Sequence, residues 1–184
     1  MTTLFGQALD EIRLCLDQVN AAQFGEAVEA LASAQRIALY GVGREGLQIK
    51  GLAMRLFHLG LRAAVVGDMT TPPVGQGDLL VVSAGPGDFS TVSALMGVAR
   101  RAGARTLLVT AEPTGGAALL ADTVLVVPAQ TMARDQGEAA TSVLPMGSLY
   151  EGALYVLFEV LILALRDRLA VTPAAMRANH TNLE

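Results

Sequence analysis

The chain has 184 residues, of which 52% are hydrophobic and 16% are charged, and this balance excludes an intrinsically disordered protein. Its length fits one domain of ordinary size, spanning residues 1–184, that needs no disulfide or metal to fold. The formal net charge is −4 and the sequence has no cluster of basic residues, which excludes electrostatic binding to nucleic acid.

The first half of the chain is predicted to form two helices, followed by strands and one further helix. Leu9, Ile12 and Leu16 follow helical spacing, whereas the short apolar run that stops at Gly41 is typical of a buried strand. Gly60 is expected to end a helix. The expected elements are helices over residues 4–22 and 25–34, a strand over 36–40, a helix over 44–59, and strands over 61–66 and 78–83.

Strands and helices continue to alternate in the second half. Asp88 is expected to cap one helix and Thr172 to cap the last one. The expected elements are a helix over residues 88–102, a strand over 105–110, a short helix over 115–121, a strand over 123–127, a loop over 128–145, and helices over 149–169 and 173–180. This alternation with short connections predicts a three-layer α/β domain with a parallel sheet and a helical N-terminal arm.

Neither a secretory signal nor a membrane span is predicted. The N-terminal region carries Asp10 and Glu11 early, which is unlike a secretory signal. The most apolar segment, residues 153–165, is interrupted by Glu159 and is too short to cross a bilayer. The single cysteine, Cys15, cannot form an internal disulfide and is expected to pack in the core. We therefore expect a soluble, cytoplasmic protein with no membrane partner.

Two glycine-rich loops follow predicted strands. The first, residues 41–46, matches the G-x-G-x-x-G dinucleotide fingerprint, and Asp68 lies 22 residues past Gly46. The second is residues 83–89. Both loops precede helices, whose N-termini attract anions through backbone N–H groups. A crevice between two such loops suits a small anionic ligand better than a long dinucleotide.

Several segments resemble the sugar isomerase (SIS) domain family, and within it the 6-phospho-3-hexuloisomerases. They are residues 41–44, 53–60, the Pro-Met-Gly segment at 145–151, and the tail at 176–184. The resemblance covers nearly the whole chain. It implies a flavodoxin-like, five-stranded parallel sheet, a homotetramer or dimer, and no metal or cofactor. It also implies that a 3-ketohexose 6-phosphate is converted to fructose 6-phosphate through an enediol.

The resemblance assigns roles to particular residues. Glu151 matches the catalytic base, and His180 matches a histidine that assists ring opening or proton movement, reaching a neighbouring subunit's site. The substrate-binding residues implied are Gly43, Arg44, Glu45, Arg55, Ala84, Gly85, Gly87 and Asp88. Read without the resemblance, Ser148-x-x-Glu151 is a helix capping box, and His180 is a solvated residue of a polar tail.

The chain departs from the family pattern in the phosphate-binding loops. Glu45 replaces the serine of the first loop, where its negative charge opposes a phosphate. Ala84, Pro86 and Phe89 replace three hydroxyl residues of the second loop, and Pro86 also lacks a backbone N–H. We infer that phosphate recognition is weakened or replaced. Two outcomes stay open: a different sugar ligand, or phosphate bound by Arg44 with Glu45 turned outward.

Three functions fit the sequence, in descending order. The first is a sugar or sugar-phosphate isomerase with Glu151 as the base. The second is a non-catalytic protein that binds or senses a carbohydrate derivative. The third is a dinucleotide-dependent enzyme, which the glycine fingerprint suggests.

Overall fold

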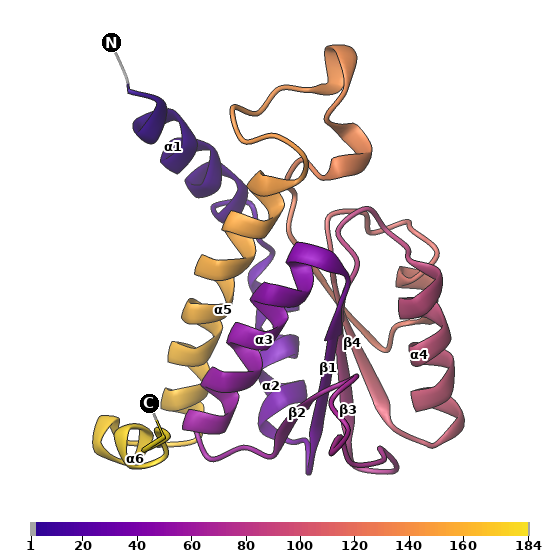
Figure 1. The fold of residues 1–184 in the computed structure, drawn as a ribbon, viewed down its shortest axis with the longest axis vertical. Coiled ribbons are helices and arrows are strands. Elements are labelled where there is room, and N and C mark those ends of the chain that lie inside the picture. The colour runs from indigo at the N-terminus through magenta and orange to yellow at the C-terminus, as the bar shows by residue number, and fades with distance from the viewer. Residues whose placement is uncertain (1–2, 184) are drawn as a thin grey trace.

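The computed structural model describes residues 3–183, so Glu184, the last residue of the family-like tail, lies outside the described part. Five parallel strands form one sheet in the order β2-β1-β3-β4-β5 (Figure 1). The strands are β1 (Ile37–Gly41), β2 (Ala63–Val65), β3 (Leu79–Ser83), β4 (Arg105–Thr110) and β5 (Thr123–Val126). The α-helices are α1 (Leu4–Leu16), α2 (Ala21–Ala32), α3 (Gly43–His58), α4 (Ser90–Arg101), α5 (Ser148–Arg168) and α6 (Pro173–Ala178). The predicted three-layer α/β fold is confirmed.

Helices cover both faces of the sheet because its strands are apolar on both sides. Ile37 and Leu39 pack into a core cluster with α2, α3 and α5. Ala38, between them, points to the opposite face and packs into a second cluster with α4. This alternation along one strand is what a central parallel strand requires.

The two predicted N-terminal helices are confirmed, but the boundary between them lies earlier in the chain than the predicted helices over residues 4–22 and 25–34 placed it. α1 ends at Leu16, and α2 begins after Asn20, whose side-chain oxygen accepts hydrogen bonds from the backbone N–H groups of Ala22 (2.9 Å) and Gln23 (3.1 Å). Asparagine is a strong N-cap, so the second helix begins at Ala21, inside the apolar pattern that was assigned to the first helix. α1 forms the predicted arm beside the start of α5 (Figure 1).

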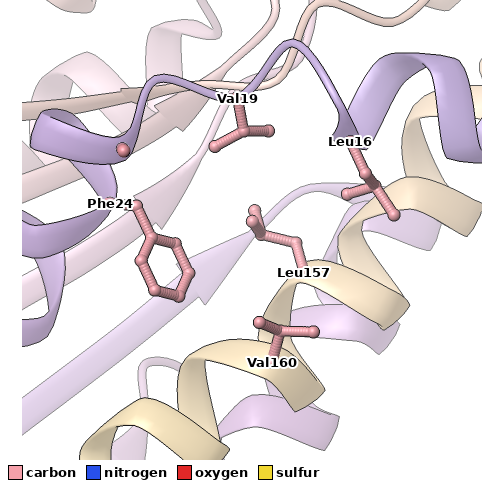
Figure 2. A pocket seen from close by; sticks show the side chains of 6 residues that line it. Leu16, Val19, Phe24, Leu157 and Val160 are labelled. Carbon is pink, nitrogen blue, oxygen red and sulfur yellow. The ribbon is translucent and has the colours of Figure 1, made fainter.

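The connection between α1 and α2 leaves a small apolar cavity of about 220 Å³ against α5. Figure 2 shows Leu16, Val19 and Phe24 on one side, facing Leu157 and Val160 of α5. The cavity therefore lies where the N-terminal arm packs against α5.

Other element boundaries also differ from prediction. Asp88 does not cap α4: Phe89 is the N-cap residue, and the Asp88 carboxylate instead accepts a hydrogen bond from the Ser93 hydroxyl. The predicted short helix over 115–121 is a single 3₁₀ turn, η1 (Ala118–Leu120). The long loop after β5 contains two further 3₁₀ turns, η2 (Met132–Arg134) and η3 (Gly137–Ala139).

The helix α5 spans nearly the predicted residues 149–169 and includes the apolar segment 153–165. By length and composition alone, its 21 residues are enough to cross a membrane. Half of its most apolar stretch is buried within the protein, where Leu154, Leu161 and Leu165 pack in the main core cluster. Its apolar composition is therefore that of a core helix.

The first glycine loop brings α3 very close to β1. A Cβ atom on Gly46 would lie 2.5 Å from the carbonyl oxygen of Gly41, so a side chain at this position requires the backbone to move. Gly43 begins α3 with φ +56°, a conformation that glycine adopts without a steric penalty. Together, Gly43 and Gly46 fix the directions in which the Arg44 and Glu45 side chains, which lie between them, point.

Candidate active site

A cavity of about 290 Å³ lies at the carboxyl end of the central strands. Three parts of the chain line it: the first glycine loop with the start of α3, the second glycine loop, and the Pro128–Pro145 loop with the start of α5. The lining residues are Val42, Gly43, Arg44, Glu45, Pro86, Phe89, Thr131, Met132, Met146, Gly147, Tyr150 and Glu151. In open parallel sheets ligands bind at this edge.

Glu151 lies in the first turn of α5 and forms an ion pair with Arg44. The Arg44 Nε atom is 3.1 Å from the Glu151 Oε2 atom, and the Glu151 side chain is only 15% exposed. Arg44 also donates hydrogen bonds to the Ser148 hydroxyl (3.1 Å) and to the Met146 carbonyl. Three contacts therefore fix the guanidinium over the start of α5.

Glu151 is not part of a capping box. Gly147, with φ +79°, is the N-cap residue of α5, and Ser148 is already the first helical residue. The carboxylate is therefore not used to satisfy the N-cap backbone, and it faces the cavity and Arg44.

Burial raises the pKa of Glu151 above that of an exposed glutamate, with a smaller contribution from the negative charge of Glu45. The Arg44 guanidinium acts in the opposite direction and lowers this pKa. The net effect is a carboxylate that is more basic than usual, beside a fixed cation. A general base requires this combination of basicity and position.

Glu45 points toward the second glycine loop. Its carboxylate accepts hydrogen bonds from the Ser83 hydroxyl (2.5 Å) and from the Gly85 backbone N–H, at 3.0 Å and 3.2 Å to its two oxygens. The Tyr150 hydroxyl lies 3.3 Å from the Ser83 hydroxyl. The side chain is buried at 7% exposure, so the alternative in which Glu45 turns outward does not hold here.

The buried network around Glu45 perturbs its titratable groups. Burial raises the pKa of Glu45, and the hydrogen bonds from Ser83 and Gly85 lower it in part. Burial, together with the charge of Glu45, raises the pKa of Tyr150 well above its ordinary value. A Cβ atom on Gly85 would lie 2.8 Å from the Tyr150 ring and 3.0 Å from the Glu45 Oε1 atom, so this loop position has room only for glycine.

The other predicted residues of the second loop do not line the cavity. Ala84 is fully buried and its carbonyl accepts a hydrogen bond from the Thr110 hydroxyl. Gly87 packs against Gly115, and Asp88 bonds to Ser93. Gly43, Arg44, Glu45 and Glu151 do line the cavity, with the Gly85 N–H bound to Glu45.

The structure does not bring Arg55 or His180 to the cavity. Arg55 forms an ion pair with Glu159 of α5 (3.1 Å), further along α3. The His180 ring stacks on His58, the last residue of α3, with ring centroids 5.1 Å apart. Because α3 has 16 residues, its two ends are about 24 Å apart. In a single chain, His180 and Glu151 therefore lie at opposite ends of α3.

Sequence reasoning gave no role to six lining residues, which are Val42, Thr131, Met132, Met146, Gly147 and Tyr150. Thr131 and Met132 belong to a loop without a motif. Met146, Gly147 and Tyr150 lie in the family-like Pro-Met-Gly segment at residues 145–151, which was the available signal. The Met146 φ of +54° and the φ of Gly147 reverse the chain direction just before α5.

Comparison with known proteins connects this geometry to a family, although no family model matches the chain. The 3-hexulose-6-phosphate isomerase of Mycobacterium gastri is 35% identical over 175 residues, covering 95% of this chain and 87% of that protein. The 3-hexulose-6-phosphate isomerase of Bacillus subtilis is 28% identical over 183 residues, covering 100% and 98%. A Methanococcus jannaschii crystal structure, from which that same function was inferred, shares the fold with a TM-score of 0.84 at 24% identity, covering 98% of each chain. The chain therefore belongs to the sugar isomerase (SIS) domain family, in its group of 3-hexulose-6-phosphate isomerases.

Proposed function

We propose that this protein interconverts a 3-ketohexose and the corresponding 2-ketohexose, with Glu151 as the base. The observation that carries this proposal is the position of Glu151, which is a sheltered, basic carboxylate at the cavity beside the fixed guanidinium of Arg44. The names of the 3-hexulose-6-phosphate isomerase relatives support the reaction class.

The proposed reaction moves a carbonyl by one carbon. Glu151 removes the proton from the carbon next to the carbonyl, which gives an enediolate. A proton then passes from the hydroxyl oxygen to the former carbonyl oxygen, and Glu151 returns its proton to the former carbonyl carbon. Negative charge develops on the oxygens of this intermediate. Arg44 is placed to stabilise that charge, because its guanidinium is already fixed and does not reorient during the reaction.

We further propose that the substrate is not held through a phosphate at the second glycine loop. Glu45 supports this proposal because its carboxylate already binds the Gly85 N–H, a group that a phosphate would need. The second loop offers the cavity only Pro86 and Phe89, which have no side-chain donors. The proposed substrate is a ketohexose that carries no phosphate at this position.

Solvent exchange tests the reaction directly. The protein is incubated in D₂O with fructose or with fructose 6-phosphate, and deuterium at C3 is followed by NMR. We expect deuterium to enter C3, and to enter fructose faster than fructose 6-phosphate. If neither sugar takes up deuterium, the isomerase proposal is wrong for this substrate class. Stabilisation by a sugar without exchange would then favour the alternative, a non-catalytic carbohydrate-binding protein.

We also propose a homo-oligomer in which His180 serves a neighbouring subunit's cavity. Large apolar side chains are exposed on α1, α3 and α5. They include Leu4, Phe5, Leu9, Leu47, Met54, Phe57, Tyr155, Val160 and Leu163. A surface with this many exposed apolar side chains suits contact with a second copy. The separation of His180 from Glu151 within one chain supports the same arrangement.

Mixing two inactive variants tests this arrangement. Glu151→Gln and His180→Ala are each expected to lose activity, and unfolding and refolding them together should restore about a quarter of the parent sites if each site uses both chains. Refolding each variant alone is the control. If the mixture stays as inactive as its components, His180 does not act across subunits.

A further inference from the structure

Thr131 is the exception among the buried hydroxyl groups of this protein. In residues 3–183 the buried serine and threonine residues are Ser83, Thr106, Thr110 and Thr131, and the Tyr150 hydroxyl is buried beside Ser83. Ser83 donates to Glu45, Thr106 donates to Asp122 (2.8 Å), and Thr110 donates to Ala84 (2.7 Å). The Thr131 hydroxyl is buried, at 3% exposure for the residue, and has no hydrogen-bond partner within this described part.

A buried hydroxyl without a partner costs stability, because it has given up its hydrogen bonds to water. Valine has nearly the same shape and would fill the position without that cost. A threonine here is therefore expected to have a polar partner when the protein works. Thr131 lines the same cavity as Arg44 and Glu151, so a molecule in that cavity is the partner within reach.

The main chain around Thr131 is well fixed. The Gln130 side-chain oxygen accepts hydrogen bonds from the backbone N–H groups of Thr141 (2.8 Å) and Ser142 (3.2 Å). The Thr131 carbonyl accepts a hydrogen bond from the Arg134 N–H (3.0 Å). These contacts on both sides hold the residue in place, which a positioning group requires.

The cavity wall beside Thr131 is adaptable. A Cβ atom on Gly147 would lie 3.2 Å from the Met132 backbone nitrogen, so this segment packs directly on the start of α5, the helix that carries Glu151. Met132 and Met146, which are 57% and 59% exposed, complete the wall. Methionine side chains change shape easily, and a ligand can therefore displace them to reach the hydroxyl.

We propose that the Thr131 hydroxyl binds an oxygen of the sugar carbon chain and positions the substrate against Glu151. This rests on the proposed function and adds to it the class of group that is recognised: a hydroxyl or carbonyl oxygen of an open-chain ketose. Thr131 acts on binding and orientation, and the proton transfer itself belongs to Glu151.

The test compares Thr131→Val with Thr131→Ser and with Thr106→Val. Thr131→Val is expected to keep or raise the melting temperature and to raise KM about three- to tenfold, with little change in kcat, because one neutral hydrogen bond to substrate is lost. Thr131→Ser is expected to restore the parent KM. Thr106→Val should lower the melting temperature, because it deprives Asp122 of a partner, and should leave KM unchanged.

KM is measured with whichever of fructose and fructose 6-phosphate the parent protein turns over, and the dissociation constant for the same sugar is measured by calorimetry. A parental KM and dissociation constant in Thr131→Val would overturn this inference while leaving the proposed function standing. If the parent neither binds nor turns over either sugar, the proposed function and the proposed role of Thr131 are both wrong. If the parent binds a sugar without turning it over, the dissociation constants of the three variants for that sugar test the role of Thr131. A larger dissociation constant in Thr131→Val alone would support that role, and a parental one would exclude it.

Discussion

Glu151→Gln is expected to lower kcat about 10²- to 10⁴-fold, the usual contribution of a general base, while leaving the fold intact. Glutamine has the same shape and can still accept the contact from Arg44, but it cannot take a proton from carbon. The measurement is the rate of deuterium entry at C3 for parent and variant, with the melting temperature as the check on folding.

Glu159→Gln is the matched control, because it lies on the same helix and its carboxylate pairs with Arg55 away from the cavity. We expect this variant to keep the parent rate. A Glu151→Gln variant that exchanges deuterium at the parent rate would exclude Glu151 as the base and would require another proton acceptor in the cavity.

The dependence of the rate on pH provides a second readout of the same residue. The base must be deprotonated, so activity is lost as the pH falls through the pKa of Glu151. Because burial raises this pKa, the loss should occur at a higher pH than for an exposed glutamate. Arg44 lowers the pKa, so Arg44→Met should move the acidic limb of the profile to still higher pH.

Most of the fold is predictable from the sequence because local signals and tertiary packing agree. The central strands are short apolar runs, and Gly60 and Gly103 follow α3 and α4 with φ of +83° and +84°. The predicted start of a helix was wrong where a local side-chain hydrogen bond selected one of two neighbouring residues as the N-cap or removed a candidate from that role. Asn20 starts α2 inside an apolar pattern, and Phe89 rather than Asp88 precedes α4.

The site is predictable only in part. The glycine loops and the family-like segment around Glu151 indicate the correct edge of the sheet. The sequence did not show the direction of the Glu45 side chain, because that depends on how closely the Gly41–Gly46 contact brings α3 to the second loop. It also did not indicate Thr131, since a single threonine in an irregular loop has no local pattern.

Converting the two glycine loops back toward a phosphate site is expected to create phosphate binding. The variant combines Glu45→Ser, Pro86→Ser and Phe89→Thr, and it leaves Ala84 unchanged because that residue is fully buried. It removes a carboxylate, frees the Gly85 N–H, and supplies three hydroxyls and one new backbone N–H. Hydrogen bonds to a charged group contribute about 1.5–3 kcal/mol each, so affinity for fructose 6-phosphate should rise by about tenfold or more.

Glu45→Gln is the control that separates the effect of the negative charge of Glu45 from the effect of its hydrogen bond to the Gly85 N–H. It removes the negative charge, but its side-chain oxygen can still accept from Ser83 and Gly85, so the loop N–H stays occupied. Because the folded state raises the pKa of Glu45, the parent should lose stability as pH rises from the unfolded pKa through the folded one, and both variants should lose this dependence. The dissociation constant for fructose 6-phosphate is then measured by calorimetry for the parent and for both variants. If the triple variant binds fructose 6-phosphate no more tightly than the parent does, Glu45 and the altered second loop do not determine phosphate recognition.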